Sequence, residues 1–151
     1  MNVPFQKDDV RQACLLFVKE RLSALQSELD ELKNDLTSES KSSAGDNHET
    51  GRAMIQLEQE CLGGQYSAVR KQFELLQRLG NQECKNIVLG SLAKINEQWY
   101  YFATGIGTVE VKGVSVIAVG LTSPPAQAVK GMALGSSTQF RDQLYRIEEI
   151  Y

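Results

Sequence analysis

The stretch LLFVKERLSALQSELDELKNDL, residues 15–36, decides the fold. Its apolar side chains recur at alternating steps of three and four residues, at Leu15, Val18, Leu22, Leu25, Leu29, Leu32 and Leu36. This spacing is the heptad seam of a coiled coil. The residues between are largely polar or charged, so the apolar stripe is narrow. The stretch therefore predicts a long helix that packs against one partner helix.

The heptad pattern stops before the small and polar residues TSESKSSAG, 37–45, which favour turns over helix. A second helix is predicted to begin at Asp46 and to end near Gly80. Its apolar positions form two sets, and the phase changes beside Gly63 and Gly64, where a kink costs little. The two sets are Met54, Leu57 and Cys61, then Leu62, Tyr66, Val69, Phe73 and Leu76.

Two helices of about 30 residues joined by a polar turn can fold back as an antiparallel hairpin, on the order of 45 Å long. Such a hairpin has little core for its surface, which suggests that it serves to reach a target. The same seam also suits a dimerising coiled coil. The leucines alone leave both arrangements open.

The composition changes at residue 80. Residues 1–80 contain 12 leucines and 5 valines plus isoleucines, whereas residues 81–151 contain 5 leucines and 13 valines plus isoleucines. The second part contains short β-prone runs separated by Gly, Asn or Asp. We expect strands at 87–89, 98–103, 108–111, 114–119 and 143–147, a turn at Lys112-Gly113, and a helix from Ala126 to Met132 after two prolines. The predicted fold class is α+β, with a hairpin domain at 1–80 and a β-rich domain at 81–151.

The overall composition, with 42% apolar and 23% charged residues, is that of an ordinary globular protein. No apolar run approaches the roughly 18 residues that span a bilayer, and the first residues lack the plan of a signal peptide. We therefore expect a cytoplasmic protein with no membrane partner. The net charge is −3, with 10 basic and 13 acidic groups up to residue 80 and 6 of each beyond it. Neither part is a basic nucleic-acid-binding surface.

Few side chains are available for catalysis or for a stable metal site. Cys14, Cys61 and Cys84 are widely separated and odd in number, and we interpret them as reduced, buried thiols. His48 is the one histidine. This set lacks the ligands for zinc and the usual parts of a Ser-His-Asp or Cys-His site. Most enzyme classes are therefore excluded.

A concentrated polar group lies between the two predicted helices, in SAGDNHETGR, residues 43–52. Asp46 and Glu49 have the spacing of a capping box, in which both carboxylates stabilise a helix N-terminus. The same carboxylates could hold a divalent cation, but Mg²⁺ takes about six oxygen ligands. The missing ligands would come from water and from a partner's acidic site. His48 between them is either a solvated turn residue or a contact to RNA or a partner.

These motifs, in this order, resemble the GreA/GreB family of bacterial transcript-cleavage factors. The resemblance covers nearly the whole chain: a helical hairpin, the acidic tip Gly45-Asp46-x-x-Glu49, and then a β-rich domain. In that domain the similar residues are Gly90-Ser91, Leu121-Thr122-Ser123-Pro124-Pro125-Ala126, Gly131 and the closing strand at 145–150. The resemblance implies an FKBP-like fold for this domain, which is not by itself a sign of isomerase activity.

The resemblance also implies that the chain binds RNA polymerase, as a monomer, through the secondary channel. Asp46 and Glu49 would help to retain Mg²⁺ shared with the polymerase active site, and would orient the water that cleaves the nascent RNA near its 3′ end in backtracked complexes. The chain would thus stimulate the polymerase and not be an enzyme by itself. The expected partner-binding residues are Gly45, His48, Lys41, Ser123 and Pro124.

The tip departs from the family pattern, which reads approximately Gly-Asp-Leu-x-Glu-Asn-x-Glu-Tyr. This chain has Asn47 for the Leu, Thr50 for the Asn, Arg52 for the second Glu and Ala53 for the Tyr. Two alternatives to cleavage stimulation therefore stay open. One is a non-catalytic regulator that binds the channel, and the other is a coiled-coil adaptor unrelated to polymerase.

Overall fold

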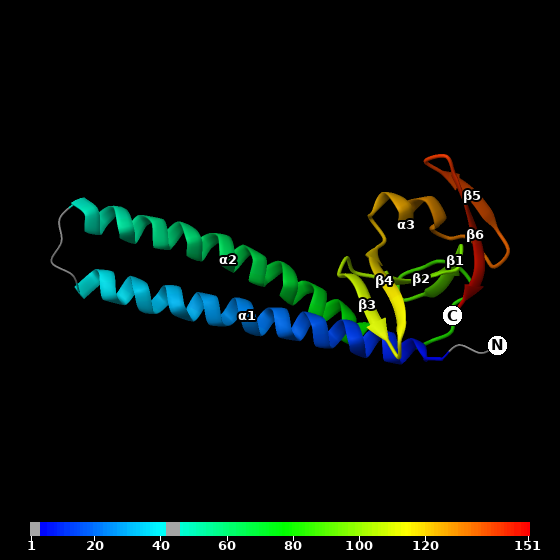
Figure 1. The fold of residues 1–151 in the computed structure, drawn as a ribbon, viewed down its shortest axis with the longest axis horizontal. Coiled ribbons are helices and arrows are strands. Elements are labelled where there is room, and N and C mark those ends of the chain that lie inside the picture. Colours follow the sequence, from blue (N-terminus) through cyan, green and yellow to red (C-terminus); the bar gives the residue numbers. More distant parts are fainter. Residues whose placement is uncertain (1–3, 42–45) are drawn as a thin grey trace. The chain divides into compact units, whose positions relative to one another are not determined.

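The computed structural model describes residues 4–41 and 46–151, and the side chains of these residues except 39–41 and 46–48. Two long helices are followed by a six-stranded mixed sheet, which confirms the predicted α+β class (Figure 1). The elements are α1 (Lys7–Lys41), α2 (Asp46–Arg78), β1 (Leu92–Ile95), β2 (Gln98–Ala103), β3 (Gly107–Val111), β4 (Val114–Gly120), α3 (Pro124–Val129), β5 (Ser137–Phe140) and β6 (Gln143–Ile150). Neither long helix contains, in its described residues, a segment apolar enough to cross a membrane.

The chain divides into two compact units. One contains Val18–Phe73, and the other contains the described residues up to Phe17 together with Glu74–Tyr151. The unit with the sheet therefore also contains the first turns of α1 and the last turn of α2. The domain boundary expected at residue 80 stays a prediction.

The heptad seam of α1 is buried within the unit Val18–Phe73, where the two helices run antiparallel (Figure 1). Val18, Leu25 and Leu32, spaced by seven residues, are buried, whereas the charged residues between them are exposed. Because a single chain buries these side chains, the partner helix of the seam is α2. The leucine pattern therefore forms the predicted hairpin.

Helix α1 also continues through residues 37–41, which we expected to form a turn. The hydroxyl of Thr37 donates a hydrogen bond to the carbonyl oxygen of Lys33 at 3.0 Å. A hydroxyl that bonds four residues back is satisfied inside the helix, so this polar stretch has no need of a turn.

Helix α2 is continuous, but the buried side of its first half differs from the prediction. Met54, Leu57 and Cys61, which we expected on the buried side, are exposed. The half-buried positions there are Ile55 and Gln59, which continue into Leu62, Tyr66, Val69 and Phe73 farther along. The expected change of phase is thus wrong, because the seam already contains Ile55 and tolerates a polar Gln59.

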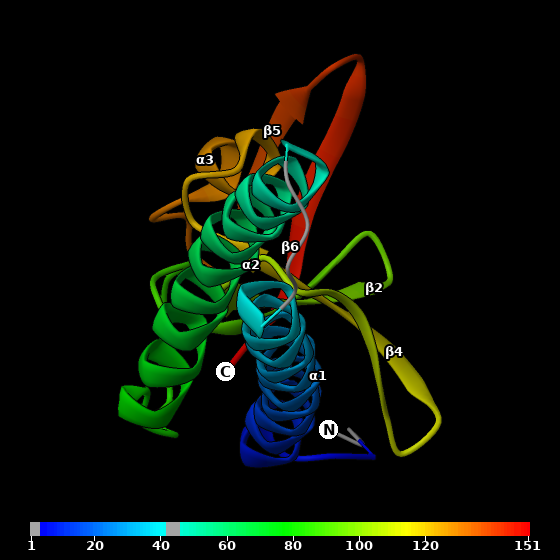
Figure 2. The same cartoon turned by 90° about the vertical axis from the view of Figure 1, so that its left-hand side faces the viewer.

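The six strands lie in the order β3-β4-β2-β1-β6-β5, in which only β2 and β4 pair in parallel among the named strands. The predicted strands at 98–103, 108–111, 114–119 and 143–147 are confirmed. The strand expected at 87–89 is wrong, because Ile87 is buried in a loop and pairing in this segment is limited to an isolated bridge between Asn86 and Ala133. Strands β1 and β5 had no prediction, and β5 pairs with β6 in the hairpin that Figure 2 shows in orange and red.

Local backbone chemistry explains two connections. Lys112 and Gly113 both have positive φ, of 48° and 82°, so the predicted turn between β3 and β4 is confirmed. Such a pair of left-handed residues matches the twist of the flanking strands. Helix α3 begins at Pro124 and ends at Val129, earlier than the predicted span of Ala126 to Met132. Its first residue is a proline, whose missing N–H is not needed there.

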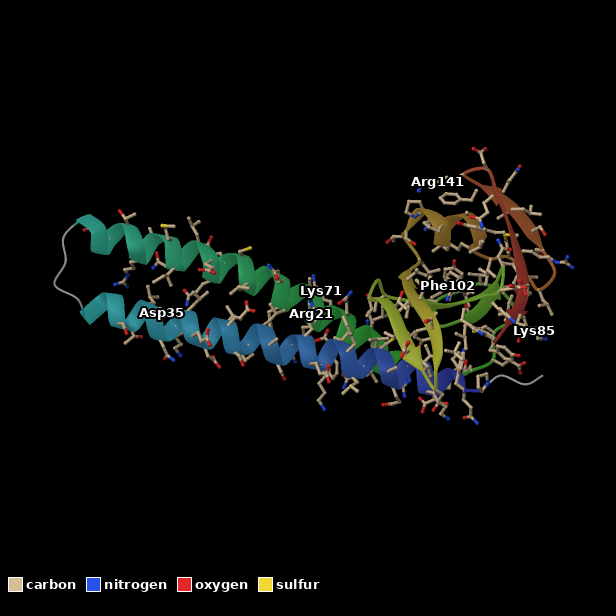
Figure 3. The ribbon with its side chains drawn as sticks, in the orientation of Figure 1. Arg21, Asp35, Lys71, Lys85, Phe102 and Arg141 are labelled. Carbon is tan, nitrogen blue, oxygen red and sulfur yellow. The ribbon has the colours of Figure 1, made fainter. Side chains whose placement is uncertain are left out.

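Side chains alternate along β2, so this strand contributes to the packing on both faces of the sheet. Trp99 and Tyr101 are buried on one face, where Phe5 packs edge-on against Trp99 at a ring-centroid distance of 5.4 Å. Phe102 lies on the other face, in a core with Val129 of α3 (Figure 3). The aromatic run of β2 thus serves packing on both sides.

Candidate functional site

The two carboxylates of the predicted tip lie in the first turn of α2. The helix begins at Asp46, as predicted, and Glu49 follows three residues later with an exposed side chain. Negative charge is stabilised at this end of a helix, where backbone N–H groups are unpaired. The structure thus brings Asp46 and Glu49 into one turn, at the end of the hairpin where α1 gives way to α2.

The structure does not describe the side chains of the other predicted tip residues. Gly45 lies outside the described residues. Lys41 is the last residue of α1 and His48 lies in the first turn of α2, but their side chains, like that of Asp46, lie outside the description. The predicted capping by Asp46 and the contacts of His48 and Lys41 therefore stay predictions.

The donor set available for a cation is small. Among the described residues, no group of three or more His, Cys, Asp or Glu side chains is arranged to hold a metal ion. Asp46 and Glu49 are hard oxygen donors of the kind that Mg²⁺ prefers, but two carboxylates supply only part of about six ligands. The prediction of a shared ion, whose remaining oxygens would come from another molecule and from water, therefore stays a prediction.

The residues after the carboxylates continue as an exposed helix surface. Thr50, Arg52 and Ala53 are exposed on α2. These are three of the positions at which the tip departs from the family pattern, so each departure changes the surface that a partner would meet. Arg52 brings a positive charge three residues after Glu49, where the pattern has a carboxylate.

The second predicted contact region opens helix α3. The Ser123 hydroxyl donates a hydrogen bond to the carbonyl oxygen of Gly120 at 2.9 Å, and the Ser123 carbonyl accepts one from the Gln127 N–H at 2.9 Å. Ser123 thus fixes the turn into the helix, while Pro124 at the first helical position is exposed. Of the two predicted residues, only Pro124 presents its side chain openly to a partner.

A cavity of about 180 Å³ lies between α3 and the sheet. Its walls are apolar and aromatic, and include Pro125, Phe102, Tyr100 and Tyr145. Burial, and then the neighbouring Tyr145, raises the pKa of the Tyr100 phenol. The sequence reasoning missed this cavity, although the alternation of Tyr100 and Phe102 in β2 was the signal for an aromatic face beneath the helix.

The cysteines are free thiols in three different environments, and the prediction that all are buried is correct for one. Cys14 is buried, which raises the pKa of its thiol to about 12 and keeps it protonated. Cys84 is half-buried, with its sulfur 3.5 Å from Lys7 Nζ. Cys61 is exposed on α2, so the expectation of burial is wrong there.

Comparison with known proteins gives only distant structural likenesses. No family model matches the chain, and no curated protein matches it. The crystal structure of GreA factor homolog 1 (Gfh1) of Thermus thermophilus has 16% sequence identity and a TM-score of 0.39, over 92% of this chain and 95% of that chain. Thermus aquaticus Gfh1 has 15% identity and a TM-score of 0.38, over 93% and 95%. At these identities and TM-scores the likeness assigns no family.

Proposed function

We propose that this chain is a Gre-like transcription factor that binds RNA polymerase through the secondary channel and stimulates RNA cleavage in backtracked complexes. The observation that carries the proposal is the position of Asp46 and Glu49 in the first turn of α2, where the long hairpin reverses. Two features support it. The elements follow the order that the family resemblance implies, and the segment Ser123-Pro124 opens a short helix beside a sheet.

The helices are long enough for a reaching function. With 35 residues in α1 and 33 in α2, each helix extends about 50 Å at about 1.5 Å per residue. The buried seam of Val18, Leu25 and Leu32 holds the two helices together with few apolar side chains. This leaves most of the surface of the hairpin free to meet the walls of a channel.

The chain's own chemistry at the tip is limited to its two carboxylates. Asp46 and Glu49 would donate oxygen ligands to Mg²⁺ shared with the polymerase, and would accept hydrogen bonds from the attacking water. In two-metal phosphoryl transfer, such an ion lowers the pKa of water and stabilises the oxygens that attack and leave. The polymerase supplies the other ligands and the RNA, so the chain is an activator without an active site of its own.

The contacts to the polymerase would be divided between the tip of the hairpin and the start of α3. Lys41, Gly45 and His48 would meet the inner end of the channel and, indirectly, the nascent RNA 3′ end. Pro124, exposed at the start of α3, would meet the polymerase at the channel entrance, with Ser123 holding the turn. The seam of α1 is occupied by α2 of the same chain, which supports a monomer and argues against a coiled-coil adaptor.

A second candidate is a channel-binding regulator that does not stimulate cleavage. The observation that favours it is the tip sequence, in which Asn47, Thr50, Arg52 and Ala53 replace four residues of the family pattern. A positive side chain at Arg52 would oppose the binding of a cation nearby. This candidate predicts polymerase binding with no change in RNA length, even at high Mg²⁺.

The experiment that separates the two candidates follows RNA length in backtracked elongation complexes of the polymerase from the same organism. Cleavage stimulated by this chain and lost in Asp46→Asn and Glu49→Gln supports the first. Binding without cleavage supports the second.

A further inference from the structure

Lys7, the first residue of α1, holds its ammonium group inside the protein. Lysine side chains usually keep the charged group in water, but only 9% of Lys7 is exposed. Its Nζ donates hydrogen bonds to the backbone oxygen of Gln82 at 2.6 Å and to that of Tyr151 at 3.3 Å. Segments that are distant in the sequence thus fix the position of this nitrogen.

The third contact of the nitrogen is a thiol. The sulfur of Cys84 lies 3.5 Å from Lys7 Nζ, and the thiol also donates to the backbone oxygen of Gln82 at 3.6 Å. The amine and the thiol therefore share one acceptor, which keeps the two groups together. They belong to the same compact unit, although 77 positions separate them in the sequence.

A small reagent can reach this pair. Cys84 is half-buried, and both Cys84 and Lys7 line a cavity of about 470 Å³. Cys14, in contrast, is buried. Cys61 is exposed, but the neighbour of its sulfur is an amide, with Gln65 Nε2 at 3.8 Å. Of the three cysteines, Cys84 is the one that combines access with an adjacent amine in the described part of the chain.

We propose that Lys7 and Cys84 are a redox modification site, at which a peroxide drives the formation of a covalent bond between Lys7 Nζ and Cys84 Sγ. The product is a sulfenamide. The site is independent of the proposed function, because neither side chain belongs to the tip or to the start of α3.

The bond forms in two steps. The Cys84 thiol first attacks hydrogen peroxide, so that the O–O bond breaks, the sulfur loses two electrons, and a sulfenic acid and one water are formed. The Lys7 ammonium then releases a proton to the solvent, and the amine attacks the sulfur. The N–S bond forms, the S–O bond breaks, and the hydroxyl leaves with one proton as a second water. In sum, one thiol, one amine and one peroxide give one sulfenamide and two waters.

The distance between the two atoms favours the second step. Reacting atoms about 3–3.5 Å apart are close to the geometry of attack, and such positioning acts as a very high effective concentration. Lys7 Nζ and Cys84 Sγ have this separation before any movement. A sulfenic acid at Cys84 is therefore captured by Lys7 faster than by a reagent in solution. A sulfenic acid at Cys61 has an amide beside it and persists until such a reagent arrives.

The bridge would join the start of α1 to the segment that leads from α2 into the sheet. A cross-link between distant positions restricts the unfolded chain and so stabilises the folded one. A thiol reductant would reverse the bond, because two reductant thiols restore the amine and the Cys84 thiol and are themselves oxidised to a disulfide. The site would thus strengthen this unit under oxidising conditions only.

Mass spectrometry tests the bond directly. The full chain is treated with hydrogen peroxide and digested with trypsin. We expect peptide 1–11, uncleaved after Lys7, to be joined to peptide 79–85, with a mass two hydrogen atoms below the sum of the two peptides. Dithiothreitol should separate the two peptides. The variant Cys84→Ser should give no joined peptide.

Dimedone, which captures sulfenic acids, gives a second measurement. When it is present with the peroxide, we expect it to label Cys61 and to leave Cys84 unlabelled, although both thiols are consumed. In Lys7→Arg the positive charge is kept, but the guanidinium is always protonated and is no attacking amine. Labelling of Cys84 should then rise about tenfold or more. Unfolding of the unchanged chain in urea, which separates Lys7 from Cys84, should have the same effect and needs no substitution.

Two results would overturn the proposal. If Cys84 is consumed and carries dimedone in the folded, unchanged chain, and no joined peptide appears, Lys7 does not capture the sulfenic acid. If the Cys84 thiol survives while Cys61 is consumed, the peroxide does not reach the pair. Both results leave the proposed function standing, because polymerase binding takes no part in either measurement.

Discussion

The ammonium group of Lys112 lies 3.2 Å from the carboxylate of Asp9, an ion pair that joins the turn between β3 and β4 to the first turn of α1. The same carboxylate accepts a hydrogen bond from the Gln6 N–H at 2.8 Å. This backbone hydrogen bond, and then Lys112, holds the pKa of Asp9 below its usual value of 3.8. The start of α1 is thus held to the sheet by a group that titrates in acid.

A pH dependence follows from this arrangement and from the adjacent Asp8. Hydrogen bonds from Asn81 and then from Arg11 lower the pKa of Asp8 below 3.8. A carboxyl whose pKa is lower in the folded state stabilises the fold above its unfolded pKa and loses that effect as the pH falls through the folded value. We expect the melting temperature to fall below about pH 4 and to fall less in Asp8→Asn. Equal acid sensitivity of the two proteins would contradict this.

Truncation of the buried seam should be costly. Leu25 is 6% exposed between α1 and α2, so Leu25→Ala leaves a cavity and is expected to cost about 2–5 kcal/mol of unfolding free energy in urea. The matched control is Leu57→Ala on the exposed side of α2, where the same truncation removes an exposed side chain and should cost about 0.5 kcal/mol or less. Equal losses in the two variants would contradict the burial of Leu25 and the exposure of Leu57.

The Tyr101 hydroxyl is buried without a hydrogen-bond partner among the described residues. Burial raises the pKa of this phenol, so it stays protonated. An unsatisfied buried hydroxyl carries a desolvation cost, and Tyr101→Phe is expected to raise the unfolding free energy by about 1 kcal/mol. Tyr100→Phe in the same strand is the control, with a change of about 0.5 kcal/mol or less. A loss of stability in Tyr101→Phe would mean that the hydroxyl has a partner.

The thiols should react in the order of their exposure. Cys61 is expected to react with a disulfide reagent at the rate of a free thiol, and Cys14 only after unfolding, because burial raises its pKa to about 12. Mass spectrometry of partly labelled protein identifies the modified residue. Early labelling of Cys14 would show that the first turns of α1 open readily from the sheet.

The leucine steps of α1 predicted a helix with one apolar seam, and burial repeats with the same period, but they did not decide between a hairpin and a dimer. In α2 the spacing did not decide which side of the helix is buried, because Met54, Leu57 and Cys61 have the same steps as the residues of the seam that begins at Ile55. Periodicity reveals stripes, but only the position of the partner helix decides which one is buried. The predicted helix α2 is therefore confirmed, but the side predicted to be buried in its first half is exposed.

The sheet shows a similar limit. Ile87 and its neighbours have the composition of a strand, yet the backbone of Ile87 bonds to Gly131 and Met132 in a loop. Strand β5, with the polar sequence STQF, gave no signal because it is an edge that pairs only with β6. The composition of a segment predicts whether its side chains are buried. It does not predict whether its backbone pairs with a distant segment, which is what defines a strand.

The candidate site was predictable in part. The spacing of Asp46 and Glu49 placed both in the first turn of a helix, and the structure begins α2 at Asp46. Ser123 and Pro124 were assigned through the resemblance, which could not tell that the Ser123 hydroxyl is engaged with Gly120 while Pro124 is exposed. The cavity beneath α3 depends on how that helix packs, and the alternation of Tyr100 and Phe102 in β2 indicated only the aromatic face that lines it.

The central claim is tested most directly by the rate of RNA shortening in purified backtracked elongation complexes. With this chain added, we expect shortening to accelerate. Asp46→Asn and Glu49→Gln should each reduce the stimulated rate by about a hundredfold or more while binding within about twofold. The exposed Glu28→Gln on α1 is the matched control and should stimulate fully. Unchanged RNA length with the bound chain, or full stimulation by both tip variants, would contradict the account.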